Sequence, residues 1–212
     1  MFINILSKRQ RSLLESLRDF NTIKEFYLAG GTATSLHLGH RYSDDFDFFS
    51  PYEFHHEEII HILKDIGTLD IRGTAWGTLH CMVNEIKLSF LHYDYPLKEP
   101  VKKALGINVA GLTDIGLMKI TAIANRGSKK DFIDLYFIAQ KHMSLKDLFT
   151  LLPKKFEGVN YSLYHLIKSL SFFEDADNEP DPIMIEEITW EEVKSYFRRE
   201  EKVLFDIFFL NE

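Results

Sequence analysis

Apolar residues recur with two different periods along the chain, and the change of period divides it into two regions. Up to about residue 93, short apolar runs bounded by glycine or proline are typical of β-strands, and amphipathic helical segments lie between them. Two helices are expected between residues 113 and 142, and from Ser144 onward every periodic segment has the spacing of a helix face. The pattern predicts an α/β (α+β) fold in which a mixed β-sheet flanked by helices is followed by an α-helical C-terminal region.

The residues that break each pattern set the expected boundaries. Strands are expected at residues 25–29, 45–49, 69–74, 78–83 and 86–93, and helices at 7–20, 54–66, 113–125 and 129–142, with a further helix running through Leu38. Glycines and Asn84-Glu85 separate the last three strands, which predicts a hairpin or meander. The sheet is expected to end at Tyr95-Pro96.

The tail of the chain is expected to be helical after Ser144, apart from an exposed acidic loop at residues 174–181. Proline interrupts this acidic stretch. The sequence shows no internal repeat and no low-complexity tract. The chain is therefore predicted to divide into a core of residues 1–142, including the N-terminal helix, and a helical C-terminal region of residues 143–212.

Composition limits the compartment and the partners. A net charge of -7 argues against a generally basic surface, so any contact with nucleic acid has to be local. The only cysteine, Cys81, excludes an intramolecular disulfide and fits a reducing cytoplasm. The apolar N-terminal run is too short for a secretory signal, and no segment approaches a membrane-spanning length. We therefore expect a cytoplasmic protein that does not bind membranes.

Two aspartates alternate with phenylalanines in Asp45-Phe46-Asp47-Phe48. Alternate residues of a strand share a face, so both carboxylates point one way while Phe46 and Phe48 point into the core. Two adjacent anions require compensation, for which a divalent cation with oxygen ligands is the natural candidate. Asp45 and Asp47 are therefore predicted ligands of Mg²⁺ (or Mn²⁺).

A glycine turn, Gly30-Gly31-Thr32, precedes this strand and opens a helix. Its backbone N–H groups and the helix N-terminus are suited to approach a phosphate, and the Thr32 hydroxyl offers another donor. Taken alone, a Gly-Gly turn or an Asp-x-Asp pair is weak evidence, because such acids are more often solvated strand ends. Arg41 is equally consistent with a triphosphate contact and with a structural ion pair to Asp44.

The order and spacing of these elements resemble the signature of the DNA polymerase β-type nucleotidyltransferase superfamily, in which the acids hold metal at a nucleoside triphosphate. The stretch from Phe26 to Phe49 looks specifically like the AbiEii/AbiGii toxin nucleotidyltransferases, and two later stretches, residues 113–126 and 129–136, continue the resemblance. It implies Mg²⁺-dependent transfer of a nucleotide from an NTP to an RNA (tRNA) or a protein acceptor. It also implies a cognate antitoxin, as in toxin–antitoxin and phage-defence pairs.

The later stretches add charged residues to the expected site. Lys119 and Arg126 lie two turns apart on one face of a predicted helix, and Asp131 and Asp134 share a face of the next helix. The resemblance makes Lys119 a phosphate-binding cation. It assigns the two aspartates to the active centre, where they would orient the cations or activate the acceptor hydroxyl. Standing alone, this region would more simply be a helix hairpin with surface salt bridges.

The expected site combines catalytic residues with nucleotide-binding residues. The expected catalytic residues are Asp45, Asp47, Lys119, Asp131 and Asp134, and the expected nucleotide-binding residues are Gly30, Gly31, Thr32, Arg41, Lys119 and Arg126.

One departure from the superfamily pattern concerns a third carboxylate, which commonly stands on a neighbouring strand. The corresponding segment here offers Lys87 or Ser89, with Glu85 and Asp94 as the acids at its two ends. This departure motivates an alternative function, in which the chain is a catalytically inactive member of the fold that binds a nucleotide or a partner. Kinase-like transfer of the terminal phosphate by the same site is a third reading.

Overall fold

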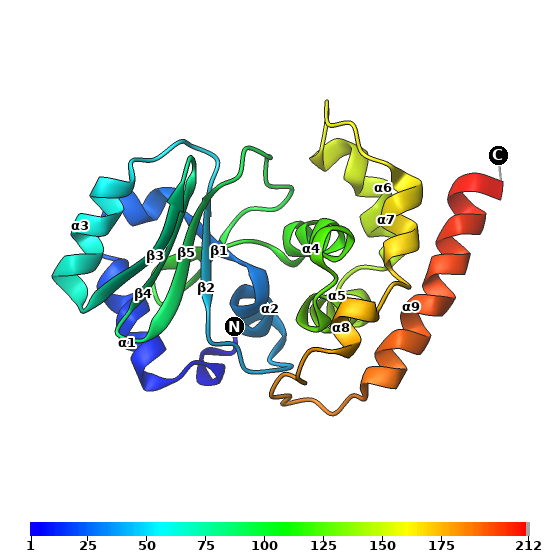
Figure 1. The fold of residues 1–212 in the computed structure, drawn as a ribbon, viewed down its shortest axis with the longest axis horizontal. Coiled ribbons are helices and arrows are strands. Elements are labelled where there is room, and N and C mark those ends of the chain that lie inside the picture. The colour runs from blue at the N-terminus through cyan, green and yellow to red at the C-terminus, as the bar shows by residue number, and fades with distance from the viewer. Residues whose placement is uncertain (211–212) are drawn as a thin grey trace. The chain divides into compact units, whose positions relative to one another are not determined.

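The computed structural model describes residues 1–210 and contains two compact units, Met1–Gly111 and Leu112–Glu212. The first unit carries all the strands of a single large sheet, and the second is built of helices (Figure 1). The division predicted between residues 142 and 143 stays a prediction. Within residues 1–210, no helix is both long enough and apolar enough to cross a membrane.

The sheet of the first unit has seven strands in the order β3-β4-β5-β2-β1-β7-β6. The strands are β1 (Tyr27–Ala29), β2 (Phe46–Ser50), β3 (Leu69–Ala75), β4 (Thr78–Val83), β5 (Ile86–His92), β6 (Lys102–Ala104) and β7 (Ile107–Val109). The β2–β5 and β1–β7 pairs are parallel and the remaining pairs are antiparallel. The predicted mixed sheet is therefore confirmed, as is the predicted meander of β3, β4 and β5.

The sheet continues beyond Tyr95-Pro96, where the sequence analysis expected it to end. A hairpin of β6 and β7 follows, and its turn residues Leu105 and Gly106 both have positive φ, at 51° and 86°. Strand β7 then pairs with β1 in parallel, with Leu28 opposite Val109. The expectation was wrong because each of these strands has only three residues, too few to show a strand period in the sequence.

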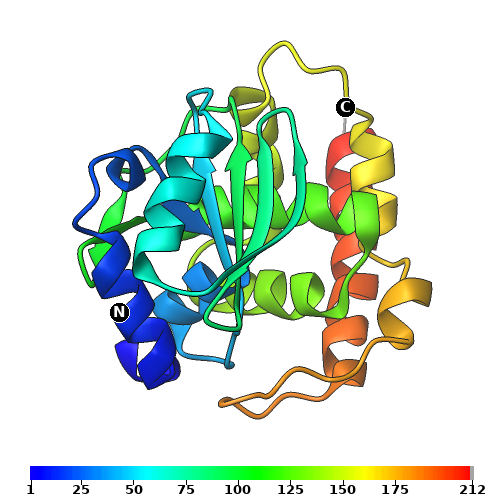
Figure 2. The same ribbon diagram turned by 60° about the vertical axis from the view of Figure 1, so that its left-hand side comes forward.

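Three helices of the first unit cover the sheet, with α1 (Lys8–Leu17) and α3 (His56–Ile66) on one face and α2 (Gly30–Leu38) on the other (Figures 1 and 2). Ser7 caps α1 in a capping box with Gln10, which confirms the predicted cap. Short 3-10 helices stand at Ile3–Ile5 and Thr22–Glu25, and the second of these shortens the strand that was expected to begin at residue 25. The helices bury the apolar side chains of the sheet.

The second unit consists of α4 (Leu112–Arg126), α5 (Lys129–Lys141), α6 (Leu145–Lys155), α7 (Leu163–Ser169), α8 (Glu174–Asp177), α9 (Trp190–Phe205) and a π-helical turn at Asp206–Leu210. Phe132 of α5 packs against Phe173, Trp190 and Phe197, with ring centroids 5.1 to 5.8 Å away. The helical character predicted after Ser144 is confirmed. Helix α8 is one short exception, because it lies in the segment that was expected to be a loop.

Candidate active site

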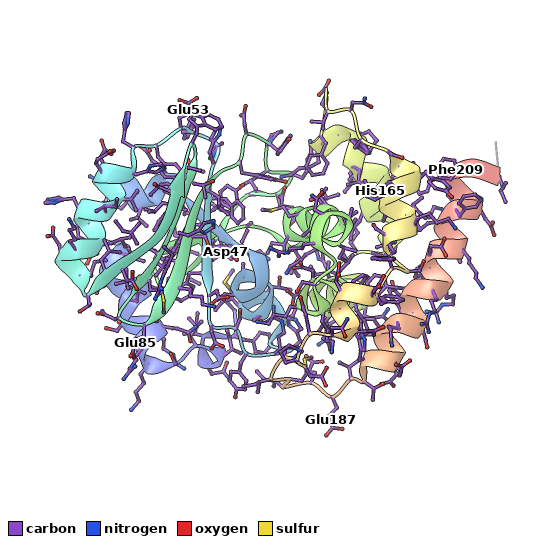
Figure 3. All side chains as sticks on the ribbon, viewed as in Figure 1. Asp47, Glu53, Glu85, His165, Glu187 and Phe209 are labelled. Atoms are coloured by element: carbon purple, nitrogen blue, oxygen red, sulfur yellow. The ribbon has the colours of Figure 1, made fainter. Side chains whose placement is uncertain are left out.

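The acidic pair lies at the beginning of β2. Phe46 and Phe48 are fully buried, whereas Asp47 is only partly buried on the opposite face, and Asp45 directly precedes the strand. The aromatic core on the buried side includes the stacked rings of Phe48 and Phe90, 5.1 Å apart. The predicted alternation of acids and core residues is therefore confirmed. Figure 3 shows Asp47 on β2, on the side of the sheet where α2 lies.

The glycine turn brings the start of α2 against the acidic strand. Gly30 has φ +66°, and a Cβ built on it would lie 2.5 Å from the Asp47 carboxylate oxygen Oδ2. A Cβ on Gly31 would collide with the guanidinium of Arg41. Both positions are therefore restricted to glycine by close approach, and Gly30 also by its backbone conformation. The consequence is that the first N–H groups of α2 lie next to the Asp47 carboxylate.

Two side chains beneath the turn fix the spacing between α2 and β2. The Thr32 hydroxyl donates to the backbone oxygen of Asp45 and lies 2.9 Å from the hydroxyl of Ser43. Arg41 is only 2% exposed, and its Nη1 donates to the backbone oxygen of Tyr42 over 2.9 Å. Both side chains thus hold the turn together from inside. Direct contacts of Thr32 and Arg41 with a phosphate stay predictions.

The acids at the start of β2 are of the type that could hold Mg²⁺. Magnesium is typically bound by one or two carboxylates and completes its shell with water and substrate phosphates. Asp45 and Asp47 supply two carboxylates, and residues 1–210 contain no group of three histidine, cysteine, aspartate or glutamate side chains suited to hold a metal ion. A metal at Asp45 and Asp47 would therefore take further ligands from the nucleotide.

The second unit gathers the remaining charged residues of the expected site into one network. The Lys119 ammonium lies 2.7 Å from Asp131 Oδ1 and 2.6 Å from Asp134 Oδ2. The side chains of all three residues are at most 6% exposed. Arg126 donates from Nε to Asp131 Oδ2 over 2.8 Å and from Nη2 to Oδ1 over 3.1 Å. The four residues that the sequence placed on two helix faces are therefore linked in one chain of ion pairs, from Arg126 through Asp131 and Lys119 to Asp134.

Burial and neighbouring positive charges have opposite effects on the pKa of Asp131 in this network. Burial raises the pKa of Asp131, but the positive charges of Lys119 and Arg126 outweigh it, so that the pKa lies below its ordinary value. Asp131 is therefore ionised at neutral pH. Arg126 differs from the other members because its side chain is 67% exposed. Lys119 is thus held rigidly inside the unit, while the Arg126 guanidinium is accessible to a ligand from solvent.

An acidic segment caps the helix that carries Asp131. The Ser128 hydroxyl and the Lys129 backbone N–H both donate to Glu179 Oε2 over 2.9 Å. The Lys129 ammonium also donates to Asp181 Oδ1, over 2.9 Å. A carboxylate at a helix N-terminus offsets the positive end of the helix dipole and satisfies its unpaired N–H groups. This role was not predicted from the sequence, although the acidic run carries a charge opposite to that of Lys129 at the helix start.

The strand position beside Asp47 carries no carboxylate. Asp47 is the direct register partner of Ser89 on β5, and Lys87 lies exposed two residues earlier. Of the two alternative acids, Glu85 lies in the turn before β5, where it pairs with Arg9 at 2.7 Å, and Asp94 follows the strand. In the folded sheet, the position next to Asp47 on β5 is therefore occupied by Ser89 and not by a third carboxylate.

Comparisons with known proteins identify the family and the fold. Residues 12–74 and 82–207 match the model of a family described as "Nucleotidyl transferase AbiEii toxin, Type IV TA system". An uncharacterized protein of Aquifex aeolicus (strain VF5) is 43% identical over 204 residues, which cover 93% of this chain and 96% of that protein.

Solved structures of low sequence identity share the fold. MenT4, a nucleotidyltransferase toxin of Mycobacterium tuberculosis H37Rv, has a TM-score of 0.60 at 16% identity over 93% of this chain and 82% of its own. JHP933 of Helicobacter pylori has a TM-score of 0.51 at 17% identity over 95% of this chain and 94% of its own. The predicted fold class, a mixed sheet flanked by helices with a helical C-terminal region, is thereby confirmed.

Proposed function

This chain belongs to the AbiEii nucleotidyltransferase toxin family, and we propose that it transfers a nucleotide from an NTP to an RNA, such as a tRNA, or to a protein acceptor in a Mg²⁺-dependent reaction. The observation that carries the proposal is the approach of the Gly30 turn to the Asp47 carboxylate. That approach supports the proposal because N–H groups at a helix N-terminus suit a phosphate and a carboxylate suits a metal ion, and a nucleoside triphosphate requires both.

The turn is the proposed binding site for the triphosphate. Gly30 and Gly31 add no side chain of their own at the positive end of α2, where an anion is stabilised. Thr32 and Arg41 complete the proposed set, Thr32 by fixing the distance from the turn to Asp45 and Arg41 by adding positive charge beneath Gly31.

Asp45 and Asp47 are the proposed ligands of Mg²⁺ (or Mn²⁺). When bound there, the ion would neutralise phosphate oxygens and favour departure of pyrophosphate. In the transfer itself, the acceptor oxygen forms a bond to the α-phosphorus while the bond from that phosphorus to pyrophosphate breaks. The protein contributes by holding the triphosphate and the acceptor in line.

Lys119 and Arg126 are proposed as cations that neutralise phosphate charge. Asp131 contacts both cations and Asp134 contacts Lys119, which supports a positioning role for the two aspartates over that of a general base. Two carboxylates hold one ammonium in a fixed place, and a pre-positioned charge lowers a barrier more than a mobile one.

We also propose a cognate antitoxin as the protein partner and the cytoplasm as the location. Membership of a toxin family described as part of a type IV toxin–antitoxin system supports the antitoxin. The single, buried Cys81 fits a reducing compartment, and burial raises its pKa to about 11, so the thiol is unreactive.

The experiment is incubation of the purified protein with Mg²⁺, total bacterial RNA and each NTP radiolabelled at the α-phosphorus. We expect label to move to RNA or to protein with the wild type and to remain with the nucleotide in the Asp45→Ala/Asp47→Ala variant. The band that carries the label identifies the class of acceptor, and released pyrophosphate distinguishes nucleotidyl transfer from kinase-like transfer, which releases a nucleoside diphosphate.

One observation favours a second function, that of an inactive nucleotide-binding member of the fold. Ser89, not a carboxylate, stands beside Asp47 in strand register. Tight NTP binding by the wild type with no transfer to any acceptor would establish this second function and refute the first.

A further inference from the structure

One row of residues crosses the sheet of the first unit through Asp47. Its members are direct register partners on consecutive strands: Ala29 on β1, Asp47 on β2, Ser89 on β5, His80 on β4 and Gly73 on β3. Side chains of directly paired residues project from the same face of a sheet. The row therefore lies on the face that carries the Asp47 carboxylate.

Ser89 and His80 form a hydrogen-bonded pair in this row. Ser89 Oγ lies 3.1 Å from His80 Nδ1. Because neighbouring strands are about 4.8 Å apart, the backbone of His80 is roughly 10 Å from that of Asp47. His80 is exposed and Ser89 partly buried. The imidazole is therefore hydrogen-bonded to Ser89, the residue on the strand between His80 and Asp47.

The two sides of Asp47 differ in what they offer a substrate. On the β1 side, the Asp47 carboxylate leans toward Gly30 and the N–H groups of the turn, where we have placed the triphosphate. In phosphoryl transfer, the attacking and leaving oxygens lie on opposite sides of the phosphorus, roughly in line. If pyrophosphate leaves on the β1 side, the acceptor hydroxyl approaches from the β5 side, over Ser89 and His80.

There is room for an acceptor at this end of the row. His80 is paired with Gly73, and a Cβ built on Gly73 would meet nothing within 4 Å. On the same face of β5, Lys87 is exposed and offers a positive charge to an anionic acceptor. The β4–β5 part of the face is thus open to solvent beside the paired hydroxyl and imidazole.

We propose that Ser89 and His80 form the acceptor side of the active site, with His80 as the group that takes the proton of the attacking hydroxyl. This inference rests on the proposed function. Ser89 Oγ accepts the Nδ1–H of the neutral imidazole, which leaves the Nε2 lone pair free to receive a proton. As the acceptor oxygen bonds to the α-phosphorus and pyrophosphate departs, the hydroxyl proton moves to Nε2 and is later lost to water.

The test compares His80→Ala with Ser89→Ala and with His61→Ala, a control at another exposed histidine, which lies on α3 and pairs with Asp65. For His80→Ala we expect kcat to fall about a hundredfold or more, as removal of a general base does. The KM for NTP should be unchanged, because the triphosphate binds on the other side of Asp47. Added imidazole should restore part of the lost rate. Ser89→Ala should lose less than His80→Ala, and His61→Ala should transfer at the wild-type rate.

Each result of this test supports or overturns the inference. His80→Gln serves as a second variant with a different side-chain size, and it should show the same loss of kcat. Wild-type rates in both His80 variants, or a loss in His80→Ala that imidazole does not relieve, would overturn the role of His80 and leave the proposed function standing. Absence of transfer by the wild type with every acceptor would overturn the proposed function, and this inference with it.

Discussion

Lys119 is the residue on which the charge balance of the second unit depends. Its ammonium is shared by two carboxylates at 2.6 and 2.7 Å, and the side chains of all three residues are almost fully buried. A buried pair stabilises only while every partner is present, because a lone charge in a low-dielectric interior is costly. Arg126 shares Asp131 but is mostly exposed, so the two cations differ in what their loss should cost.

Replacing Lys119 should therefore destabilise the protein more than replacing Arg126. Lys119→Ala removes the buried ammonium that Asp131 and Asp134 share, and we expect a loss of about 3–5 kcal/mol in the free energy of unfolding. Arg126→Ala is the matched control, with an expected loss of about 1 kcal/mol or less, as for exposed pairs. Urea denaturation measures both. Equal losses in the two variants would mean that Lys119 is not the buried centre of the network.

The lowered pKa of Asp131 predicts a dependence of stability on pH. A carboxyl whose folded-state pKa lies below its unfolded-state value of about 3.9 stabilises the fold above that pH, and the contribution is lost as pH falls through the folded-state pKa. We expect the urea midpoint to decrease as pH falls below about 4. In Asp131→Asn the decrease should be smaller, and an equally steep decrease in that variant would place the titrating group elsewhere.

At the scale of residues, the sequence predicted side chains whose neighbours lie nearby along the chain. The alternation in Asp45-Phe46-Asp47 follows from strand geometry alone, and the shared helix face of Asp131 and Asp134 follows from helix geometry. The pairing of Ser89 with His80 depends on the register of β4 and β5, because shifting it by one residue would move Ser89 to the other face. No local pattern reports that register.

The strand–turn–helix element formed by β1, the glycine turn and α2 makes its own prediction. Gly30→Ala introduces a Cβ 2.5 Å from Asp47 Oδ2 at φ +66°, so it should cost about 1–2 kcal/mol and abolish nucleotide transfer. Gly158→Ala is the matched control, since Gly158 has φ +77° with nothing within 4 Å of a built Cβ. That variant should show a similar loss of stability and full activity. Transfer by Gly30→Ala at the wild-type rate would separate the turn from the reaction.

Helix α5 depends on a cap from a distant segment. Glu179 accepts from the Ser128 hydroxyl and the Lys129 N–H, so Glu179→Ala should lose about 0.5–2 kcal/mol, the usual value of an N-terminal cap. Hydrogen exchange should quicken in the first turn of α5, which carries Asp131. Glu187→Ala is the control, because Glu187 is exposed and points away from the fold in Figure 3. Unchanged exchange in Glu179→Ala would show that the helix does not need this cap.

Elements were predictable where they were long. The helices of residues 112–126 and 129–141 and the meander strands have enough residues to show a period, and their positions follow from it. Strands β6 and β7 have three residues each, and the cap by Glu179 joins positions about 50 residues apart. Short strands and distant caps are set by tertiary packing, which overrides local preference.

At the scale of the whole molecule, the fold class was predictable because two periods separate a sheet-forming region from a helical one. The family was recognisable because its motifs stand on these elements in a fixed order. The net charge restricts how the protein can attract nucleic acid. With a total of -7, the proposed RNA acceptor has to be attracted by local cations, for which Lys87 and Arg126 are candidates.

The parallel pairing of β1 with β7 also determines when the sheet can be completed during synthesis of the chain. Leu28 meets Val109 only after the residues between them have left the ribosome, so β1 remains an edge strand during most of the synthesis of the first unit. An unpaired edge is open to wrong partners, and a parallel contact between distant residues forms slowly. A nascent chain of this toxin family therefore carries its glycine turn on an unfinished sheet. The sheet that carries the glycine turn can therefore be completed only after Val109 has been synthesised.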